Sequence, residues 1–222
     1  MAGIDTIAHV THEPADPFHR IGNNIAVDFA NTVYSPHNEN GSLLNADDVL
    51  HFLRTAGALS TTNARELRRL LHDDDTGKSF FKRALQLRSA IRDALEALDE
   101  RRPVSDGALA VLNEALRANA GHLDLRPVSK TRYALEYRHS SRGLGYVLAP
   151  IAEATAELLA SPTQARIRRC ASDDCIRYFY DDSRTGRRRW CEMAICGNRA
   201  KTAAFVERRR ASKRLTNAIG HI

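Results

Sequence analysis

The sequence predicts a protein that is mainly α with a short β-hairpin (α+β), in which a helical N-terminal domain precedes a small C-terminal unit formed by a hairpin and a following helix. Three observations support this fold class. Apolar residues recur every three or four positions over residues 78 to 98, as on one face of a long helix. Residues 123 to 137 instead contain two alternating apolar and polar runs, as a hairpin does. All four cysteines of the 222-residue chain lie between Cys170 and Cys196.

The first part of the chain reads as an irregular segment, residues 1 to 22, followed by a series of helices. Residues 25 to 33 are apolar at helical spacing, although alternate positions would suit a strand equally well, and we favour the helix. A clearer helix begins after Asn45, which is a good N-cap residue, and stops at Gly57. We expect a further helix from about residue 62 to 72.

The longest helix is expected over residues 78 to 98, and another over about 105 to 118, each with one apolar stripe. The two alternating runs, around 123 to 125 and 133 to 137, then predict a hairpin. A last helix of the N-terminal domain is expected over about 148 to 159.

Charge and cysteine content change abruptly near Ser161 and Pro162, so we place a domain boundary there. It separates a helical domain of residues 23 to 162 from a C-terminal unit of residues 163 to 222. From Ser161 onward the chain has 15 Lys and Arg against 6 Asp and Glu, a net charge of 15 − 6 = +9. This is more than the net charge of the whole protein, which is +6. This asymmetry indicates an anionic partner, with nucleic acid first and an anionic membrane surface second, while a solubilising tail is the alternative.

The cysteines form two pairs that each enclose four residues, with fifteen residues between the pairs. We expect the spacer, residues 176 to 190, to form a hairpin that turns at Gly186 and returns as a strand. The four sulfurs would then converge on one zinc ion per chain. Two disulfides, an iron–sulfur cluster and buried free thiols are the alternatives. The N-terminus has no signal-peptide pattern, so we expect the protein in the reducing cytoplasm, where disulfides are rare. The cysteine spacing also suits structural zinc better than an iron–sulfur cluster. The expected zinc ligands are Cys170, Cys175, Cys191 and Cys196.

The residues after Cys196, "GNRAKTAAFVERRRASKR", are alanine-rich and contain no proline, which predicts a helix that starts at the metal site. Its positive residues fall on several faces, as suits a groove with phosphates on both walls. We expect Phe205 and Val206 to pack against the metal-binding part.

At these residues the sequence resembles a known family. The stretch from Cys170 to Lys201 is similar to the CGNR zinc finger, whose tetrapeptide is here residues 196 to 199. The match includes an Asp-x-Ser-Arg turn, with Asp182, Ser183 and Arg184 in a shifted form. The segment "IAVDFANTV" and the helical region after it resemble the ABATE domain, so the resemblance covers nearly the whole chain. It implies a bacterial, stress-related, DNA-binding transcriptional regulator.

Duplex DNA is therefore the expected partner. RNA or protein binding by the same zinc-dependent unit is the alternative, because small zinc folds serve all three roles. No enzyme activity is expected, because a four-cysteine site leaves no open coordination position and no catalytic metal or nucleophile motif occurs. We expect phosphate contacts mainly from six arginines and base contacts from two further residues: Arg187, Arg188, Arg189, Arg208, Arg209 and Arg210, then Arg199 and Lys201.

The helical domain contains polar residues among apolar ones, which suggests a sensor pocket for a small ligand, although caps and core hydrogen bonds are the commoner use of such groups. The candidate pocket residues are Asp28, Asn31, Thr32, Arg88 and Arg92. No apolar run is long enough to span a membrane. The oligomeric state is open, with a homodimer as one option.

Overall fold

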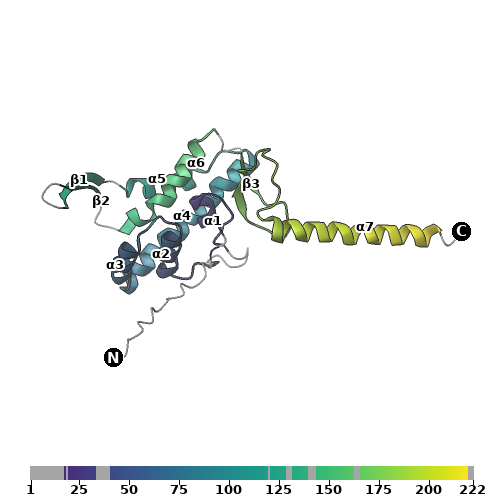
Figure 1. The fold of residues 1–222 in the computed structure, drawn as a ribbon, viewed down its shortest axis with the longest axis horizontal. Coiled ribbons are helices and arrows are strands. Elements are labelled where there is room, and N and C mark those ends of the chain that lie inside the picture. The colour runs from purple at the N-terminus through teal and green to yellow at the C-terminus, as the bar shows by residue number, and fades with distance from the viewer. Residues whose placement is uncertain are drawn as a thin grey trace, which may run out of the picture.

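The computed structural model describes residues 18, 20–33, 41–119, 121–128, 132–139, 144–162 and 166–219. Within these residues the protein is mostly helical. A cluster of helices forms the body, a β-hairpin projects at one end, and a long single helix extends from the other end (Figure 1). No helix in the described ranges combines the length and the apolar character that crossing a membrane requires.

The elements follow in the order α1 (Ile25–Ala30), α2 (Ala46–Thr55), α3 (Thr61–Leu71), α4 (Asp74–Glu100), α5 (Asp106–Arg117), β1 (Gly121–Pro127), β2 (Tyr133–His139), η1 (Leu144–Leu148), α6 (Ala149–Ala160), β3 (Ile167–Arg169), β4 (Tyr178–Tyr180), η3 (Met193–Gly197) and α7 (Asn198–Ile219). The expected order of helices and the first hairpin are thus confirmed. β1 and β2 pair antiparallel, with Leu123 opposite Tyr137 and Leu125 opposite Leu135.

Helix α1 forms the centre of the core. It is apolar on almost every side, and Val27 and Phe29 are fully buried. Asn24 caps its N-terminus by accepting hydrogen bonds from the backbone N–H groups of Ala26 and Val27. The helix packs against α4, α6 and β4, so one short segment contacts both the helical domain and the beginning of the C-terminal unit.

Helix α4 is the longest element that is packed against the body, with 27 residues. Asp73 caps its N-terminus, and its buried face includes Phe80, Leu87 and Leu95. The helix ends at Arg101, whose φ of 56° places it in the left-handed region that terminates many helices.

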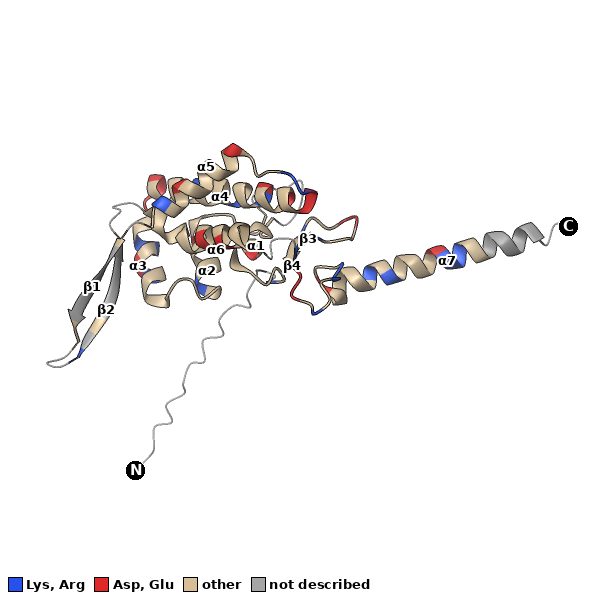
Figure 2. Ribbon diagram, turned by 90° about the horizontal axis from the view of Figure 1, so that it is seen from above, with Lys and Arg blue, Asp and Glu red and all other residues tan. Residues whose placement is uncertain are grey.

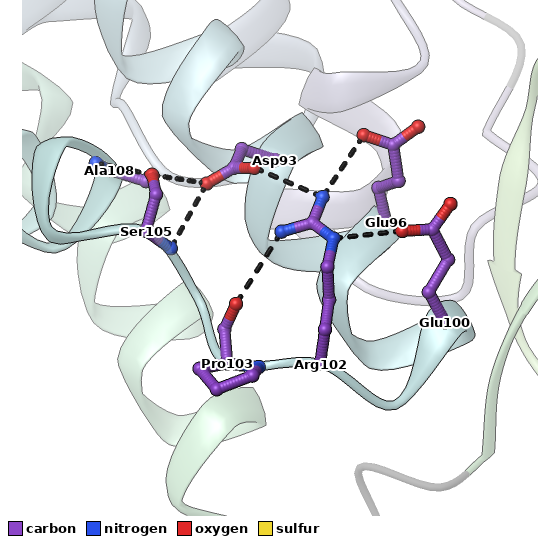
Figure 3. Close-up of polar contacts among 7 residues, drawn as sticks. All are labelled: Asp93, Glu96, Glu100, Arg102, Pro103, Ser105 and Ala108. Atoms are coloured by element: carbon purple, nitrogen blue, oxygen red, sulfur yellow. Dashed lines mark hydrogen bonds and ion pairs between the residues drawn. The ribbon is translucent and has the colours of Figure 1, made fainter.

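The end of α4 is fixed by the next residue, Arg102, whose guanidinium forms ion pairs with three carboxylates of the helix (Figure 3). These belong to Asp93, Glu96 and Glu100, at distances of 3.2, 3.2 and 2.8 Å. Asp93 in turn accepts a 2.6 Å hydrogen bond from the hydroxyl of Ser105, which is the N-cap of α5. One polar network therefore sets the angle between α4 and α5.

Two expectations about the C-terminal unit are wrong in detail. The strand β4 pairs with β3, which precedes the first cysteine, and residues 187 to 190 form no returning strand. The run after Gly186 is held instead by one hydrogen bond, from Arg188 N to buried Asp181, and by one backbone bond, from Ala171 N to the Arg189 carbonyl.

Phe205 and Val206 are the second departure, because they are 53% and 40% exposed and do not pack as expected. Helix α7 leaves the body immediately after the metal site, so neither side chain has a surface to cover it (Figure 1).

Candidate metal centre and nucleic-acid interface

The four cysteines converge at one point of the finger, which we define as residues 166 to 197. Cys170 directly follows β3 and Cys175 lies just before β4, so the loop of the short β3–β4 hairpin supplies the first pair. Backbone hydrogen bonds shape this loop, from Cys170 N to the Arg177 carbonyl and from Cys175 N to the Ser172 carbonyl, each 2.9 Å long.

Cys191 and Cys196 supply the second pair. The N–H of Cys191 donates to the sulfur of Cys170 at 3.4 Å, which joins the two pairs directly. Cys196 lies in the turn η3, where the backbone N–H groups of Cys196 and Gly197 both donate to the Glu192 carbonyl. A side chain at Gly197 would require the exposed end of Met193 to move and would press on Trp190, with its Cβ 3.2 Å from Trp190 Cδ1, so glycine suits this close packing.

The sulfur positions fit a single tetrahedral metal ion. All four Sγ atoms lie within 4.8 Å of one another, and Cys191 Sγ is 3.7 Å from Cys175 Sγ and 3.6 Å from Cys196 Sγ. A zinc–sulfur bond of ~2.3 Å requires tetrahedral sulfurs to lie about 3.8 Å apart, close to these two distances. None of the four cysteines is more than 8% exposed.

The protonation chemistry of the cluster supports the same conclusion. The hydrogen bond with Cys191 lowers the pKa of Cys175 to about 5, while the same bond raises the pKa of Cys191. Burial raises the pKa of Cys196. The first thiolate to form thus opposes ionisation of its neighbours, and four thiolates coexist when a cation lies between them. The residues present therefore fit one structural zinc ion with no open coordination position.

Asp181 is the polar centre of the finger, and the sequence pattern alone did not single it out. It is fully buried, and its Oδ1 accepts hydrogen bonds from the backbone and hydroxyl of Ser183, at 3.1 and 2.5 Å. Its Oδ2 accepts from the backbone of Arg188 and lies 3.5 Å from Arg168 Nε. Burial opposes ionisation, but these hydrogen bonds outweigh it, so the pKa of Asp181 is lowered.

The acidic residue of the Asp-x-Ser-Arg turn is therefore Asp181 and not Asp182, whose side chain is 62% exposed. The signal in the sequence was the Asp-x-Ser spacing, since an aspartate commonly accepts from the backbone two residues ahead.

The arginine run has three different environments. Arg188 is used inside the finger, where its guanidinium donates to the carbonyls of Trp190 and Cys191 and lies 4.6 Å from the centre of the Phe179 ring. Arg189 stacks on Trp190 at 4.9 Å. Arg187 is exposed and has no hydrogen bond or ion pair with any described residue.

Helix α7 carries the remaining candidate contacts. Every residue from 201 to 212 is exposed, and lysine and arginine residues occur along the described length of the helix (Figure 2). Arg210 lies 4.0 Å from Glu207, and Arg209 lies over Phe205. Three cations have no hydrogen bond or ion pair within the described part of the chain: Arg199, Lys201 and Arg208.

The five residues of the expected ligand pocket lie together at the joint between the helical domain and the finger. Asp28 Oδ1 accepts from Gly22 N at 2.7 Å, and Arg88 donates to Thr32 Oγ1 at 3.3 Å. Asn31 binds the backbone of Tyr178 from both sides: its Nδ2 donates to the carbonyl at 2.7 Å and its Oδ1 accepts from the N–H at 2.9 Å.

Arg92 completes the joint by donating to the carbonyls of Ala30 and Ile176. Among the described residues, every buried side-chain nitrogen and oxygen has a hydrogen-bond partner within the protein. Asn31 and Arg92 thus connect the helical domain to the finger, and a ligand bound among the five residues remains a prediction.

Fold and site together define a zinc-finger protein in which a helical domain precedes a four-cysteine finger. Family models match residues 23–162 to ABATE, described as "Putative stress-induced transcription regulator", and residues 166–209 to the CGNR zinc finger. The first match spans well over half of the chain, so this protein belongs to the ABATE family and carries a CGNR zinc finger. A search of curated proteins finds no match.

Proposed function

We propose that this protein is a DNA-binding transcriptional regulator of the cytoplasm, in which the finger and α7 contact duplex DNA and the helical domain acts as a sensor or interaction domain. The observation that carries this proposal is the exposure of α7. Its 22 residues give a length of roughly 33 Å, and the described side chains from 201 to 212 touch no other element closely enough to be buried. A free helix with cations on several faces suits a DNA groove.

The position of the helix assigns roles to its residues. α7 begins two residues after the metal ligand Cys196, so Arg199 and Lys201 are held close to the rigid finger and are the better candidates for base contacts. Arg187 on the finger and Arg208 farther along α7 are free to neutralise phosphates. Arg188 is not assigned to DNA, because its guanidinium is used within the finger.

The proposal excludes enzyme activity at the metal. Four cysteine sulfurs fill a tetrahedral zinc site, which leaves no position for a water or a substrate. Four free cysteines also suit a reducing compartment.

A protein-binding role for the same unit is the second candidate, and exposed apolar groups favour it. Phe205 and Val206 on α7 and Met193 and Ile195 on η3 are between 40% and 56% exposed. The apolar groups would pack against a partner protein, whereas the cations would remain solvated.

Binding of the full-length, zinc-loaded protein to duplexes selected from a random library, with an RNA pool as competitor, tests the proposal. If about six phosphates are contacted, the logarithm of affinity should fall against the logarithm of salt concentration with a slope near −5. Arg199→Ala should weaken the selected sequence more than random DNA, by about 1 to 3 kcal/mol. If no duplex shows salt-dependent binding even at low ionic strength, the DNA proposal fails and the protein-binding role becomes the better account.

A further inference from the structure

Two adjoining hollows lie along one face of α4, where it meets η1 and α5. The larger has a volume of about 390 Å³ and is lined by Thr76, Ser79 and Phe80, among others. The smaller has a volume of about 130 Å³ and is lined by apolar side chains that include Leu87 and Leu148. Arg83 and Gly145 line both hollows, so the two form one groove with Arg83 at its middle.

The side chain of Arg83 is exposed and has no hydrogen bond or ion pair with any residue that the structure describes. The third hollow, of about 370 Å³ between α2, α3 and α4, differs in this respect. In that hollow the cations are neutralised, with Arg68 2.9 Å from Asp47 and Lys78 2.7 Å from Asp74. The groove around Arg83 thus offers an unpaired cation beside apolar walls.

Gly145 keeps the middle of this groove open. A Cβ atom at this position would lie 2.9 Å from the Cβ of Ala118, closer than real Cβ contacts, and 3.9 Å from Arg83 Nη1. Glycine therefore permits the close approach to Ala118 and places no side chain beside the guanidinium of Arg83.

We propose that this groove binds a small carboxylate with an apolar body. The carboxylate would pair with Arg83, which suits planar, bidentate recognition of such groups, and the body would lie on the half-buried side chains of Val111, Ala115 and Leu144. The groove is also lined by Asp75 and Glu114, whose two carboxylates disfavour a second negative charge on the ligand and favour an ammonium group. A ligand with one carboxylate and one ammonium group, as in an apolar amino acid, matches this charge pattern best.

The groove is connected to the finger by α4 itself. The ligand would contact the half of α4 from Asp75 to Leu87, while Arg92 and Asp99 on the other half form hydrogen bonds with the finger. The site is therefore placed where a small molecule could act on the finger, but its existence does not depend on DNA binding.

Calorimetric titration of the full-length, zinc-loaded protein without DNA tests this site with three probes that share one phenyl body. These are 3-phenylpropionate, which has a carboxylate, L-phenylalanine, which has a carboxylate and an ammonium group, and 2-phenylethylamine, which has an ammonium group. We expect at least one of the two carboxylates to bind saturably at millimolar concentration or below, and 2-phenylethylamine to bind at least about tenfold more weakly.

Arg83→Met should weaken the carboxylate at least about tenfold, because it removes the charge and keeps an apolar stem. Lys82→Met, which removes an exposed charge from the next position of the same helix, should leave the affinity unchanged. If neither carboxylate binds, if the amine binds equally well, or if Arg83→Met has no effect, the site does not exist as proposed. If both carboxylates bind, the effect of the ammonium group on affinity distinguishes a simple acid from an amino acid.

Discussion

Single residues in this finger have roles that composition cannot reveal. Arg187, Arg188 and Arg189 are identical and consecutive. Yet Arg187 is exposed with no partner among the described residues, Arg188 is built into the finger and Arg189 stacks on an indole ring. The difference arises from Asp181, which accepts a hydrogen bond from the backbone of Arg188 and so turns that side chain inward across Phe179. Counting arginines as DNA contacts therefore overestimates the number that can reach phosphate.

Substitution of two adjacent arginines separates the two roles. Arg188→Ala should lower the free energy of unfolding of the zinc-loaded protein by about 2 kcal/mol, because the carbonyls of Trp190 and Cys191 lose a charged donor. Arg187→Ala should change it by less than about 0.5 kcal/mol and instead make the salt dependence of DNA binding shallower by about 0.9. Urea unfolding and salt titration of DNA affinity measure the two quantities. Equal losses of stability in the two variants would contradict these roles.

At the level of secondary structure, the sequence predicts helices better than it predicts the finger. Asn45 caps α2 through a capping box with Asp48, as its position suggests, and periodicity identifies α4, although the helix begins four residues earlier than expected at Asp74. These signals are local, because caps and amphipathic faces depend on residues within a few positions of one another.

The errors concern contacts between distant residues. β3 has three residues, too few for an alternation pattern, and its pairing with β4 depends on the metal loop between them. The packing of Phe205 and Val206 could not be judged from α7 alone, because their burial depends on the direction in which the helix leaves the finger. The metal ligands were predictable for the opposite reason, since their spacing is itself the signal.

The contact between α4 and α5 can be tested through the pKa of Asp93, which accepts a hydrogen bond from Ser105. The Ser105 hydroxyl, together with Arg102, holds the pKa of Asp93 below its ordinary value. A carboxyl whose pKa is lowered by folding stabilises the protein above pH ~4 and loses that contribution as the pH falls through the folded-state pKa. In Ser105→Ala the pKa of Asp93 should rise toward the ordinary value of an aspartate carboxyl, as carboxyl NMR titration would show. Ser105→Thr keeps the hydroxyl and should leave the pKa low, whereas an unchanged value in Ser105→Ala would contradict the contact.

Over the whole molecule, the finger and the helical domain are joined through a continuous core. Tyr178 of β4 is 3% exposed and packs with the apolar residues of the helical domain, while Asn31 binds its backbone from both sides. The segment before α1 adds a bond from Tyr180 N to the Gly22 carbonyl, and Asp99 at the end of α4 accepts from Arg169 N. The metal ligands Cys170 and Cys175 flank the strands that make these contacts, so metal binding and the stability of the helical domain should be coupled.

Metal removal tests this coupling with two independent probes. Trp190 is the one tryptophan of the chain and reports on the finger by fluorescence, whereas circular dichroism reports mainly on the helical domain. In the zinc-loaded protein the two melting curves should coincide. Zinc can be removed by chelation or by Cys175→Ser, which should lose the stoichiometric zinc. Either change should also lower the melting temperature of the helical domain, because the β3–β4 hairpin that covers Asn31 is no longer held by the metal.

The size of the effect at the joint can be estimated from its hydrogen bonds. Asn31→Ala removes two buried bonds and should lower the free energy of unfolding by about 2 to 3 kcal/mol, which corresponds to about 4 to 12 °C for a chain of this size. It should also separate the fluorescence and dichroism transitions, since the finger then unfolds without the helices. Asn63→Ala, on the exposed face of α3, is the matched control and should leave both curves in place. If the melting temperature of the helical domain does not change when zinc is removed, the finger is only tethered to that domain and does not stabilise it.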